Sequence, residues 1–247
     1  MIQREQTAGI LTLRLAHGKA NTLDAELCEE IIQELRDAEA SDARAVILTG
    51  TGSIFSAGVD LFRMTDGGED YVRRFFPALR DAFVTLFRFP KPIVAAVNGH
   101  AIAGGCLLAA ACDYRLMSSG KIGVPELLVG VPFPAIAIEI LRFACGPNAQ
   151  SLAYSGRTVS PEEARSVGLI DDTVESDDLM IAAQSVAQKF AALGGTNFAI
   201  TKRQLRSASV EQMEKLGATD DDAIRIWSSP QVHTHIRDYL SRTVGKK

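Results

Sequence analysis

The segment from Pro92 to Cys112 constrains the fold most, because it is the most apolar stretch of the chain. Its length, about 20 residues, would suit a membrane-spanning helix. A polar turn, Asn98-Gly99-His100, interrupts it in the middle, and two glycines divide its second half. We therefore expect a buried strand over residues 93–97, a turn, and a buried helix of small residues over 103–112 rather than a membrane span.

The rest of the first two thirds alternates between strand and helix patterns. Residues 45–49 (AVILT) are apolar throughout, which is typical of a strand covered on both faces. Residues 9–15 alternate apolar and polar, as a half-buried strand does. Asp24 can cap a helix with an apolar residue at every fourth position, and residues 70–88 show a second helical stripe. Alternating strands and helices predict an α/β architecture.

The C-terminal part of the chain has a different pattern. Ser160-Pro161-Glu162-Glu163 is a complete helix start, with an N-cap serine, a proline in the first turn and a glutamate three residues after the cap. From about residue 177 onward the pattern is helical. We therefore expect an α/β core with the active site over residues 1–190 and a helical region over residues 191–247.

Composition excludes several classes of protein. The formal net charge of −4 argues against a general nucleic-acid binder, although residues 196–247 carry nine Lys and Arg against six Asp and Glu. The four cysteines form no CxxC pair and lie in apolar segments, so we expect neither a disulfide framework nor a cysteine zinc site. Residues 1–15 show no signal-peptide pattern, and we expect a cytoplasmic or soluble lumenal enzyme without membrane contact.

Known phosphate-binding and nucleophile motifs do not fit. Gly50-Thr51-Gly52 follows a strand, but the third glycine of a dinucleotide fingerprint is Phe55. Ser56 lacks the preceding glycine of a nucleophile elbow, because Ile54 stands there. His233 and His235 are two residues apart and would point to different faces of a helix, so we expect no metal site.

Two other turns are better candidates for chemistry. Ser56-Ala-Gly-Val59 and Ala103-Gly104-Gly105 each follow a buried strand with small residues that can expose backbone N–H groups. Gly104 stands at a predicted helix N-terminus, where free N–H groups and the helix dipole favour negative charge. Both turns could serve packing alone, or they could form an oxyanion hole from two backbone donors. Spacing by itself favours packing.

The order of motifs along the chain resembles the crotonase superfamily, the enoyl-CoA hydratase/isomerase family. The resemblance covers essentially the whole chain. It rests on segments 21–27, 45–61, 91–116, 122–132, 154–157 and 161–170. It implies a spiral of ββα turns followed by a trimerising helical region, an acyl-CoA thioester as substrate, and no cofactor beyond the coenzyme A of that substrate. It also implies a homotrimer or a dimer of trimers.

The resemblance also assigns roles to residues. The backbone N–H groups of Val59 and Gly104 correspond to the family's two oxyanion donors. Thr22, Ala57 and Leu61 correspond to positions along the coenzyme A site. Lys202 lies in the basic region where family members meet the coenzyme A phosphates, and a solvated helix charge is an equal alternative for it.

Departures from the family pattern bear on the reaction. Family hydratases carry two glutamates; the first position is Leu107 here, and the second is Glu126. Phe133 replaces a glycine that usually follows Val131-Pro132. The stretch around Leu107 is similar to the mitochondrial-type isomerases, which also keep only the second glutamate. Leu107 and Phe133 would then lie beside the acyl group.

Three functions remain open at this point. We favour an isomerase that converts 3-enoyl-CoA into 2-enoyl-CoA with Glu126 as the single acid and base, because an apolar wall protects the transferred proton from water. A hydratase would need a second acid, for which Asp60 and His100 are the nearest candidates in the sequence. A crotonase-fold protein that binds acyl-CoA without catalysis is the third interpretation.

Overall fold

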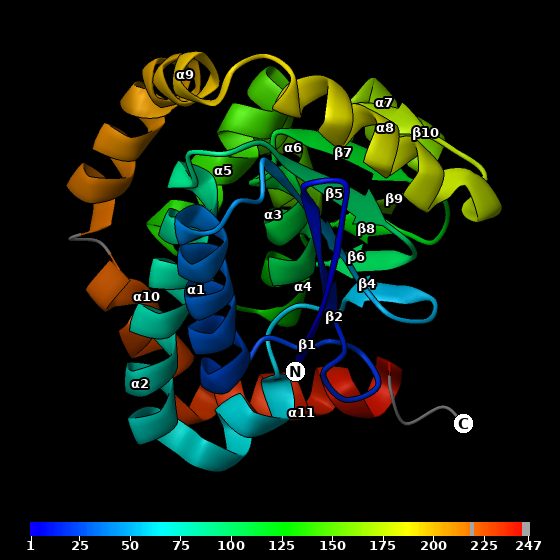
Figure 1. Ribbon diagram of the computed structural model, residues 1–247. Coiled ribbons are helices and arrows are strands. Elements are labelled where there is room, and N and C mark those ends of the chain that lie inside the picture. The colour runs from blue at the N-terminus through cyan, green and yellow to red at the C-terminus, as the bar shows by residue number, and fades with distance from the viewer. Residues whose placement is uncertain (218–219, 244–247) are drawn as a thin grey trace.

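The computed structural model describes residues 1–217 and 220–243, which form two β-sheets surrounded by helices (Figure 1). The larger sheet has the order β1-β2-β3-β5-β7-β10. Its strands are β1 (Ile2–Thr7), β2 (Ile10–Leu15), β3 (Ala45–Thr49), β5 (Ile93–Val97), β7 (Tyr114–Met117) and β10 (Asp172–Thr173). β1 and β2 pair antiparallel, and every other neighbouring pair is parallel.

Three strands of the smaller sheet each come directly after a central strand of the larger sheet along the chain. Its order is β4-β6-β8-β9, with β4 (Ile54–Ser56), β6 (His100–Ile102), β8 (Ile122–Gly123) and β9 (Thr158–Val159). The chain thus repeats a strand in the large sheet, a strand in the small sheet and a helix, as β3-β4-α2, β5-β6-α3 and β7-β8-α4. This confirms the spiral of ββα turns that the resemblance implies.

The helices follow the strands and then dominate the C-terminal third. Their bounds are α1 (Ala25–Ala40), α2 (Leu61–Arg88), α3 (Gly104–Ala110), α4 (Glu126–Val129), α5 (Ala135–Cys145), α6 (Ala149–Ser155), α7 (Pro161–Ser166), α8 (Leu179–Ala191), α9 (Gly195–Leu216), α10 (Asp220–Trp227) and α11 (Pro230–Thr243). Short 3₁₀ turns occupy Gly146–Asn148 and Ser176–Asp178. The division at residue 190 falls at the end of α8 and stays a prediction.

Burial explains why β3 and β5 are apolar throughout. Every residue of both strands is buried. On one face, α8 covers the sheet with Leu179, Ala183 and Ala187, and on the other face the main core of α1, α2, α3 and α5 packs. The four cysteines are buried and free. In the described part of the chain, no helix combines the length and apolarity needed to cross a membrane.

Helix starts follow the capping residues, whereas one helix is longer than its pattern predicts. Asp24 caps α1 by accepting a hydrogen bond from the Leu27 N–H at 2.8 Å, as expected. The pattern predicts a helix over residues 70–88, but α2 begins at Leu61, where the Asp60 side chain accepts from the Arg63 N–H. The helix is kinked at Gly68, whose φ is 61°, so the helical period is interrupted there.

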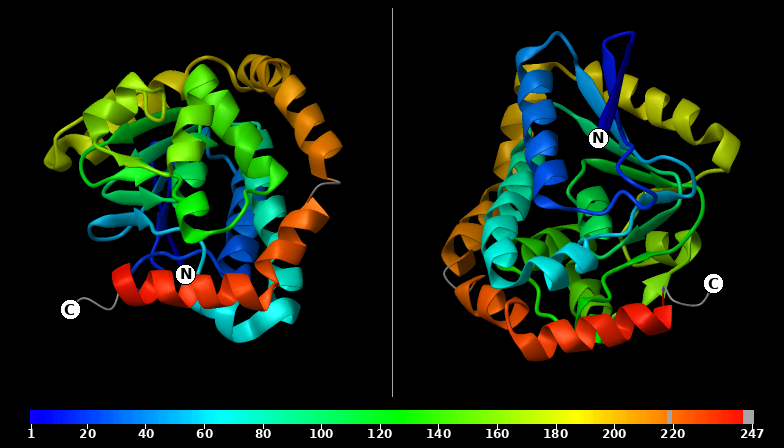
Figure 2. Two further views of the ribbon diagram at one scale, coloured as in Figure 1. Left: turned by 180° about the vertical axis from the view of Figure 1, so that it is seen from behind. Right: turned by 90° about the horizontal axis from the view of Figure 1, so that it is seen from below.

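The C-terminal helices return to the spiral core. α10 packs against α2, and α11 packs against both α2 and α4. Figure 2 shows α11 crossing the molecule below the sheets, with α10 beside α2. Trp227 of α10 and Tyr239 of α11 thereby line one cavity with Ala57 and Val59 of the turn that follows β4.

Candidate active site

The two small-residue turns lie against each other although about 45 residues separate them in the sequence. Gly58 lies so close to the start of α3 that a Cβ there would stand 2.7 Å from the Ile102 carbonyl oxygen and 3.0 Å from the Gly104 nitrogen. Its φ of +82° also requires glycine. The parallel pairing of β4 with β6 causes this approach, since both turns leave the small sheet at the same edge.

The second turn carries backbone strain beside the same point. Ala103 has φ 52° and ψ −123°, a conformation that residues with a Cβ rarely adopt. Residue 105 is also a glycine, because a Cβ at this position would stand 2.2 Å from the Ser56 carbonyl oxygen. The strained turn allows α3 to begin at Gly104 with its first N–H groups beside Gly58.

Both candidate donors are available. Among the described residues, no protein group accepts a hydrogen bond from the backbone N–H of Val59 or of Gly104. The neighbouring groups are occupied: the Leu23 N–H donates to the Gly58 carbonyl, and the Asp60 N–H donates to the Leu23 carbonyl. Val59 and Gly104 both line one cavity. The geometry therefore provides two unpaired N–H donors at one place, as an oxyanion hole requires.

The segment around Thr22 fixes the first turn in position. The Asn21 side-chain amide donates to the carbonyls of Ile54 and Phe55, and the Ser56 hydroxyl donates to the Asn21 carbonyl at 2.7 Å. Thr22 is half-buried beside this turn, outside the cavity lining. Its role along coenzyme A stays a prediction.

Glu126 is the carboxyl group of the cavity. It is the first residue of α4, directly after Pro125, and only 8% of its surface is exposed. Its Oε2 atom is buried without a hydrogen-bond partner. Burial raises the pKa of Glu126 to about 8, against a smaller lowering by its backbone hydrogen bond. Because a general base works best with a pKa near the working pH, this side chain is suited to proton transfer.

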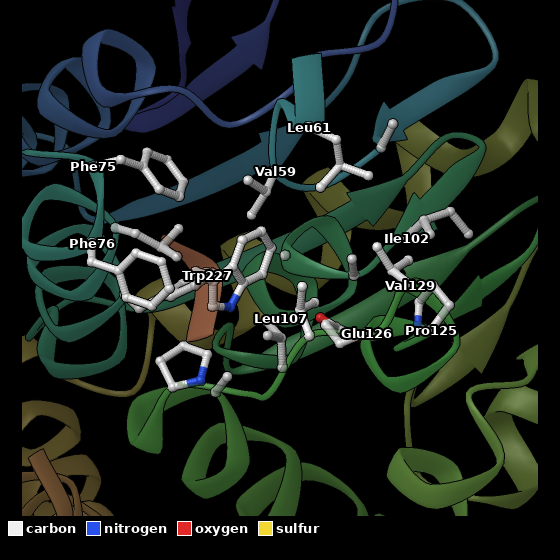
Figure 3. Close-up of a pocket in the computed structure, with 18 of the residues that line it drawn as sticks. Val59, Leu61, Phe75, Phe76, Ile102, Leu107, Pro125, Glu126, Val129 and Trp227 are labelled. Carbon is white, nitrogen blue, oxygen red and sulfur yellow. The ribbon is translucent and has the colours of Figure 1, made fainter. Parts of the chain in front are cut away.

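The cavity around Glu126 is small and mainly apolar, with a volume of about 100 Å³. Figure 3 shows the Glu126 carboxyl beside Leu107, with Phe75 and Phe76 at the other side of the cavity. Leu107 comes from α3 and is 2% exposed. Of the residues that the sequence and the resemblance single out, the cavity contains Ala57, Val59, Leu61, Gly104, Leu107 and Glu126.

Other proposed site residues lie elsewhere. Phe133 is half-buried against the main core and does not line the cavity. Asp60 caps α2, and His100 is exposed, with its Nδ1 atom accepting from the Lys121 N–H. Neither of these two side chains lines the cavity, so the structure provides neither as a second acid for hydration. His233 is buried, and its Nε2 atom lies 2.7 Å from the Trp227 carbonyl oxygen.

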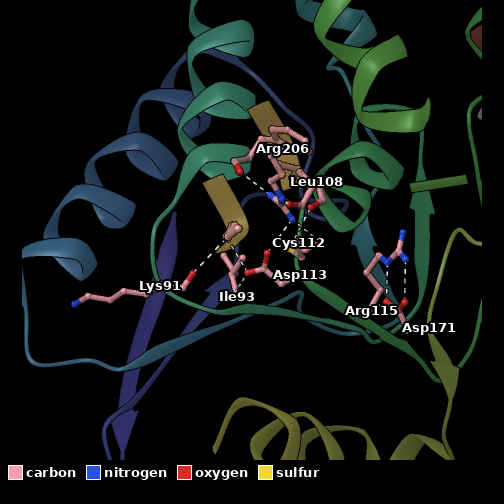
Figure 4. Close-up of polar contacts among 11 residues, drawn as sticks. Lys91, Ile93, Leu108, Cys112, Asp113, Arg115, Asp171 and Arg206 are labelled. Carbon is pink, nitrogen blue, oxygen red and sulfur yellow. Dashed lines mark hydrogen bonds and ion pairs between the residues drawn. The ribbon is translucent and has the colours of Figure 1, made fainter. Parts of the chain in front are cut away.

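The placement of Lys202 disagrees with one of the two expectations for it, that of a solvated helix charge. Its ammonium group lies 2.7 Å from Asp113 Oδ2, and 6% of the residue is exposed. Arg206 contacts the other oxygen of Asp113 at 2.8 Å, and Figure 4 shows Asp113 beside Arg206 and the start of β5. Lys202 is therefore not a solvated charge, because it forms part of the buried ionic group that attaches α9 to the core, and its role toward the coenzyme A phosphates stays a prediction.

Sequence reasoning missed residues from the C-terminal helices. Trp227 of α10 and Tyr239 of α11 line the cavity together with Phe76 and Phe83 of α2. The sequence offered one signal, the single tryptophan of the chain, which is only 4% exposed. In the described residues, no group of three His, Cys, Asp or Glu side chains is arranged to hold a metal ion.

Comparisons with known proteins agree with this geometry. The model of the family "Enoyl-CoA hydratase/isomerase" matches residues 5–242. Rat mitochondrial enoyl-CoA delta isomerase 1 is 29% identical over 100% of this chain and 88% of the relative. A putative enoyl-CoA hydratase from Thermus thermophilus is 34% identical over 76% of each chain. The crystal structure of human mitochondrial delta3-delta2-enoyl-CoA isomerase superposes with a TM-score of 0.94 at 26% identity, covering 100% of this chain and 99% of that one.

Proposed function

Since this chain belongs to the enoyl-CoA hydratase/isomerase family, we propose that it converts a 3-enoyl-CoA into the 2-enoyl-CoA with Glu126 as the single acid and base. One observation carries the choice of isomerisation. Among the described residues that line the cavity, Glu126 has the one carboxyl group, and Leu107 stands where a hydratase of the family has its other glutamate. The full-length similarity to enoyl-CoA delta isomerases supports the same choice.

The reaction needs one group that moves a proton between two carbons. The ionised Glu126 removes a proton from C2, and the electron pair of that C–H bond moves into a dienolate. The same carboxyl group then donates the proton to C4. A double bond forms between C2 and C3, the double bond between C3 and C4 is lost, and the thioester carbonyl is restored. Atoms and charge balance without a co-reactant.

The dienolate oxygen carries the developing negative charge. In the proposed complex, the N–H groups of Val59 and Gly104 donate to this oxygen, and the first turn of α3 contributes its dipole. Loss of one such donor costs about 3–4 kcal/mol of transition-state stabilisation in enzymes of known mechanism. A weak base can then remove a C2 proton, because the oxyanion hole supplies much of the stabilisation.

The apolar lining suits isomerisation better than hydration. Water that entered the cavity would exchange with the proton carried by Glu126 or add to the conjugated product. Leu107 offers water no hydrogen bond, and the unpartnered Oε2 of Glu126 leaves one carboxylate oxygen free to receive the proton. The same burial raises the pKa of Glu126 to about 8, which makes its ionised form a stronger base than a solvated glutamate.

The test is a paired assay on purified protein. With 3-enoyl-CoA substrates of several chain lengths, we expect absorbance of the conjugated thioester to appear, whereas 2-enoyl-CoA should not be hydrated. Glu126→Gln should abolish isomerisation and leave acyl-CoA binding nearly unchanged. Loss of 2-enoyl-CoA to a hydrated product would contradict the proposed reaction. Absence of C2 proton exchange with saturated acyl-CoA in D₂O would favour the binding-protein interpretation.

A homotrimer or a dimer of trimers belongs to the same proposal. Leu128 of α4 and Tyr154 of α6 are 56% and 71% exposed, and α4 packs against α6. Exposed apolar side chains on neighbouring helices are typical of a surface that another subunit covers. Sedimentation at two protein concentrations would measure the mass of the assembly, and a monomer at both would contradict this part of the proposal.

A further inference from the structure

The cavity that contains Glu126 is closed at the side away from the carboxyl group. Phe76 of α2 and Trp227 of α10 form an edge-to-face pair there, with ring centroids 5.7 Å apart and planes at 69°. Phe75 packs edge-on against Phe76 with centroids 6.2 Å apart. Figure 3 shows Phe75 and Phe76 on the side of the cavity opposite Pro125 and Glu126, with the Trp227 ring between Phe76 and Leu107.

The aromatic wall is held firmly in place. The Trp227 Nε1–H donates to the Pro132 carbonyl at 3.1 Å, so the indole is fixed to the loop that precedes α5. Phe76 and Trp227 are 5% and 4% exposed. The two rings pack on each other across α2 and α10, so an acyl chain in the cavity meets a buried aromatic wall.

A second cavity lies directly behind this wall. It has a volume of about 40 Å³ and is lined by Phe76, Leu79 and Pro134, which also line the Glu126 cavity. Its other lining residues include Arg80, whose side chain is 54% exposed, and Ile224 of α10. The second cavity therefore extends from the wall toward the protein surface between α2 and α10.

We infer that Phe76 and Leu79 are specificity-determining residues, which separate the two cavities and restrict the enzyme to short-chain acyl groups. This inference rests on the proposed function, because it concerns the substrate of the same site. An apolar cavity of about 150 Å³ holds a benzene molecule, so a cavity of about 100 Å³ holds on the order of four carbons. A longer acyl chain would have to pass through the position of the Phe76 ring.

Removing the separation should join the cavities into one channel. Phe76→Leu and Leu79→Ala each shorten a side chain that borders both cavities. Phe87→Leu is the matched control, because Phe87 is a buried aromatic residue of the same helix that lines neither cavity. Comparing three variants separates the effect of opening the wall from a general loss of packing in α2.

The measurement is the ratio of kcat/KM for 3-dodecenoyl-CoA to that for 3-hexenoyl-CoA. Each methylene that becomes buried contributes about fourfold to binding, so two or more newly accommodated methylenes raise the ratio at least about tenfold. We expect this rise for Phe76→Leu and Leu79→Ala, and a change of less than about twofold for Phe87→Leu. The wild-type protein should strongly prefer the shorter substrate.

Calorimetric binding of saturated hexanoyl-CoA and dodecanoyl-CoA provides a readout that needs no catalysis. If the affinity ratio shifts in the two variants while no 3-enoyl-CoA is isomerised, the separation stands and the proposed reaction fails. If the wild-type protein isomerises and binds both lengths equally, or if the ratio is the same in all variants, the inference is wrong. Failure of the wild-type protein to bind either acyl-CoA would overturn both.

Discussion

The substitution Glu126→Gln tests the burial of the proposed catalytic carboxyl group without any substrate. In the unfolded chain this glutamate ionises near its ordinary pKa of 4.5, whereas in the folded protein burial raises its pKa to about 8. Between these values the unfolded state binds fewer protons than the folded state at this site. The contribution of Glu126 to the free energy of unfolding therefore falls as pH rises, by about 1.4 kcal/mol per pH unit.

The pH dependence that Glu126 gives to the free energy of unfolding has the opposite sign to that of a salt-bridged carboxylate. Below pH 4.5 both states are protonated at Glu126 and the penalty is absent, and above pH 8 it reaches its full value of about 5 kcal/mol. Between pH 5 and pH 8 the wild-type protein should lose about 3–4 kcal/mol relative to Glu126→Gln, because glutamine has no proton to release. The variant should therefore become the more stable protein, relative to the wild type, as pH rises.

Urea unfolding of both proteins at one protein concentration, at pH 5, 6, 7 and 8, measures this difference. Contributions from all other titrating groups cancel in the comparison. Glu5→Gln is the control for the chemical change itself, because Glu5 is exposed on β1 and lies outside the cavity. Parallel stability profiles for the wild type and Glu126→Gln would refute the reasoning, since they would mean that Glu126 is ionised in the folded protein at neutral pH.

Further predictions concern the proposed oxyanion hole, the buried ionic group and the choice of reaction. Gly58→Ala should lower kcat by at least about a hundredfold, because it disturbs the geometry of the backbone donors. The kcat of Val59→Ala should stay within a few fold of the wild-type value, because Val59 acts through its N–H. Steady-state kinetics on a 3-enoyl-CoA measures both. Lys202→Met should lower the free energy of unfolding by about 1–3 kcal/mol in urea titrations, because Asp113 loses one buried charged hydrogen bond and keeps its ion pair with Arg206, and an unchanged KM for acyl-CoA would distinguish this structural role from phosphate binding. Leu107→Glu should introduce measurable hydration of 2-enoyl-CoA at the expense of isomerisation, and chromatography of the products would detect a 3-hydroxyacyl-CoA. Isomerisation by the wild type should rise with pH and level off near pH 8, because the base must be ionised, so a profile already flat from pH 6 would contradict the raised pKa.

Local patterns in the sequence predict the elements around the site well, because each depends on neighbouring residues. The buried strands at residues 45–49 and 93–97, the cap at Asp24 and the small-residue helix after Ala103 all follow from composition over short windows. The kink at Gly68 could not be predicted in this way. The helix continues on both sides of it through contacts with α1, and the periodicity of the sequence does not record those contacts.

Residues that reach the site from far away in the sequence are not predictable in this manner. Trp227 lines the cavity because α10 folds back onto α2, and no local pattern records that return. Lys202 shows the converse: a basic residue on a helix suggests a solvated charge, but the ion pair with Asp113 places it in the interior. Both outcomes depend on tertiary contacts between segments about 90 or more residues apart.

Two buried glutamates in this protein show how the partner of a carboxyl group decides its role. Glu139 is 4% exposed, and Arg142 one turn away donates to its Oε1, so this carboxyl group has a cationic partner. Glu126 is buried to a similar extent, but its Oε2 has no partner, and its pKa rises instead. An unpaired buried carboxyl group costs several kcal/mol of folding free energy at neutral pH, whereas an apolar residue of similar size would avoid that cost. Glu126 lines the same cavity as the two unpaired N–H donors of Val59 and Gly104, so a substrate bound there could use that proton in the proposed reaction.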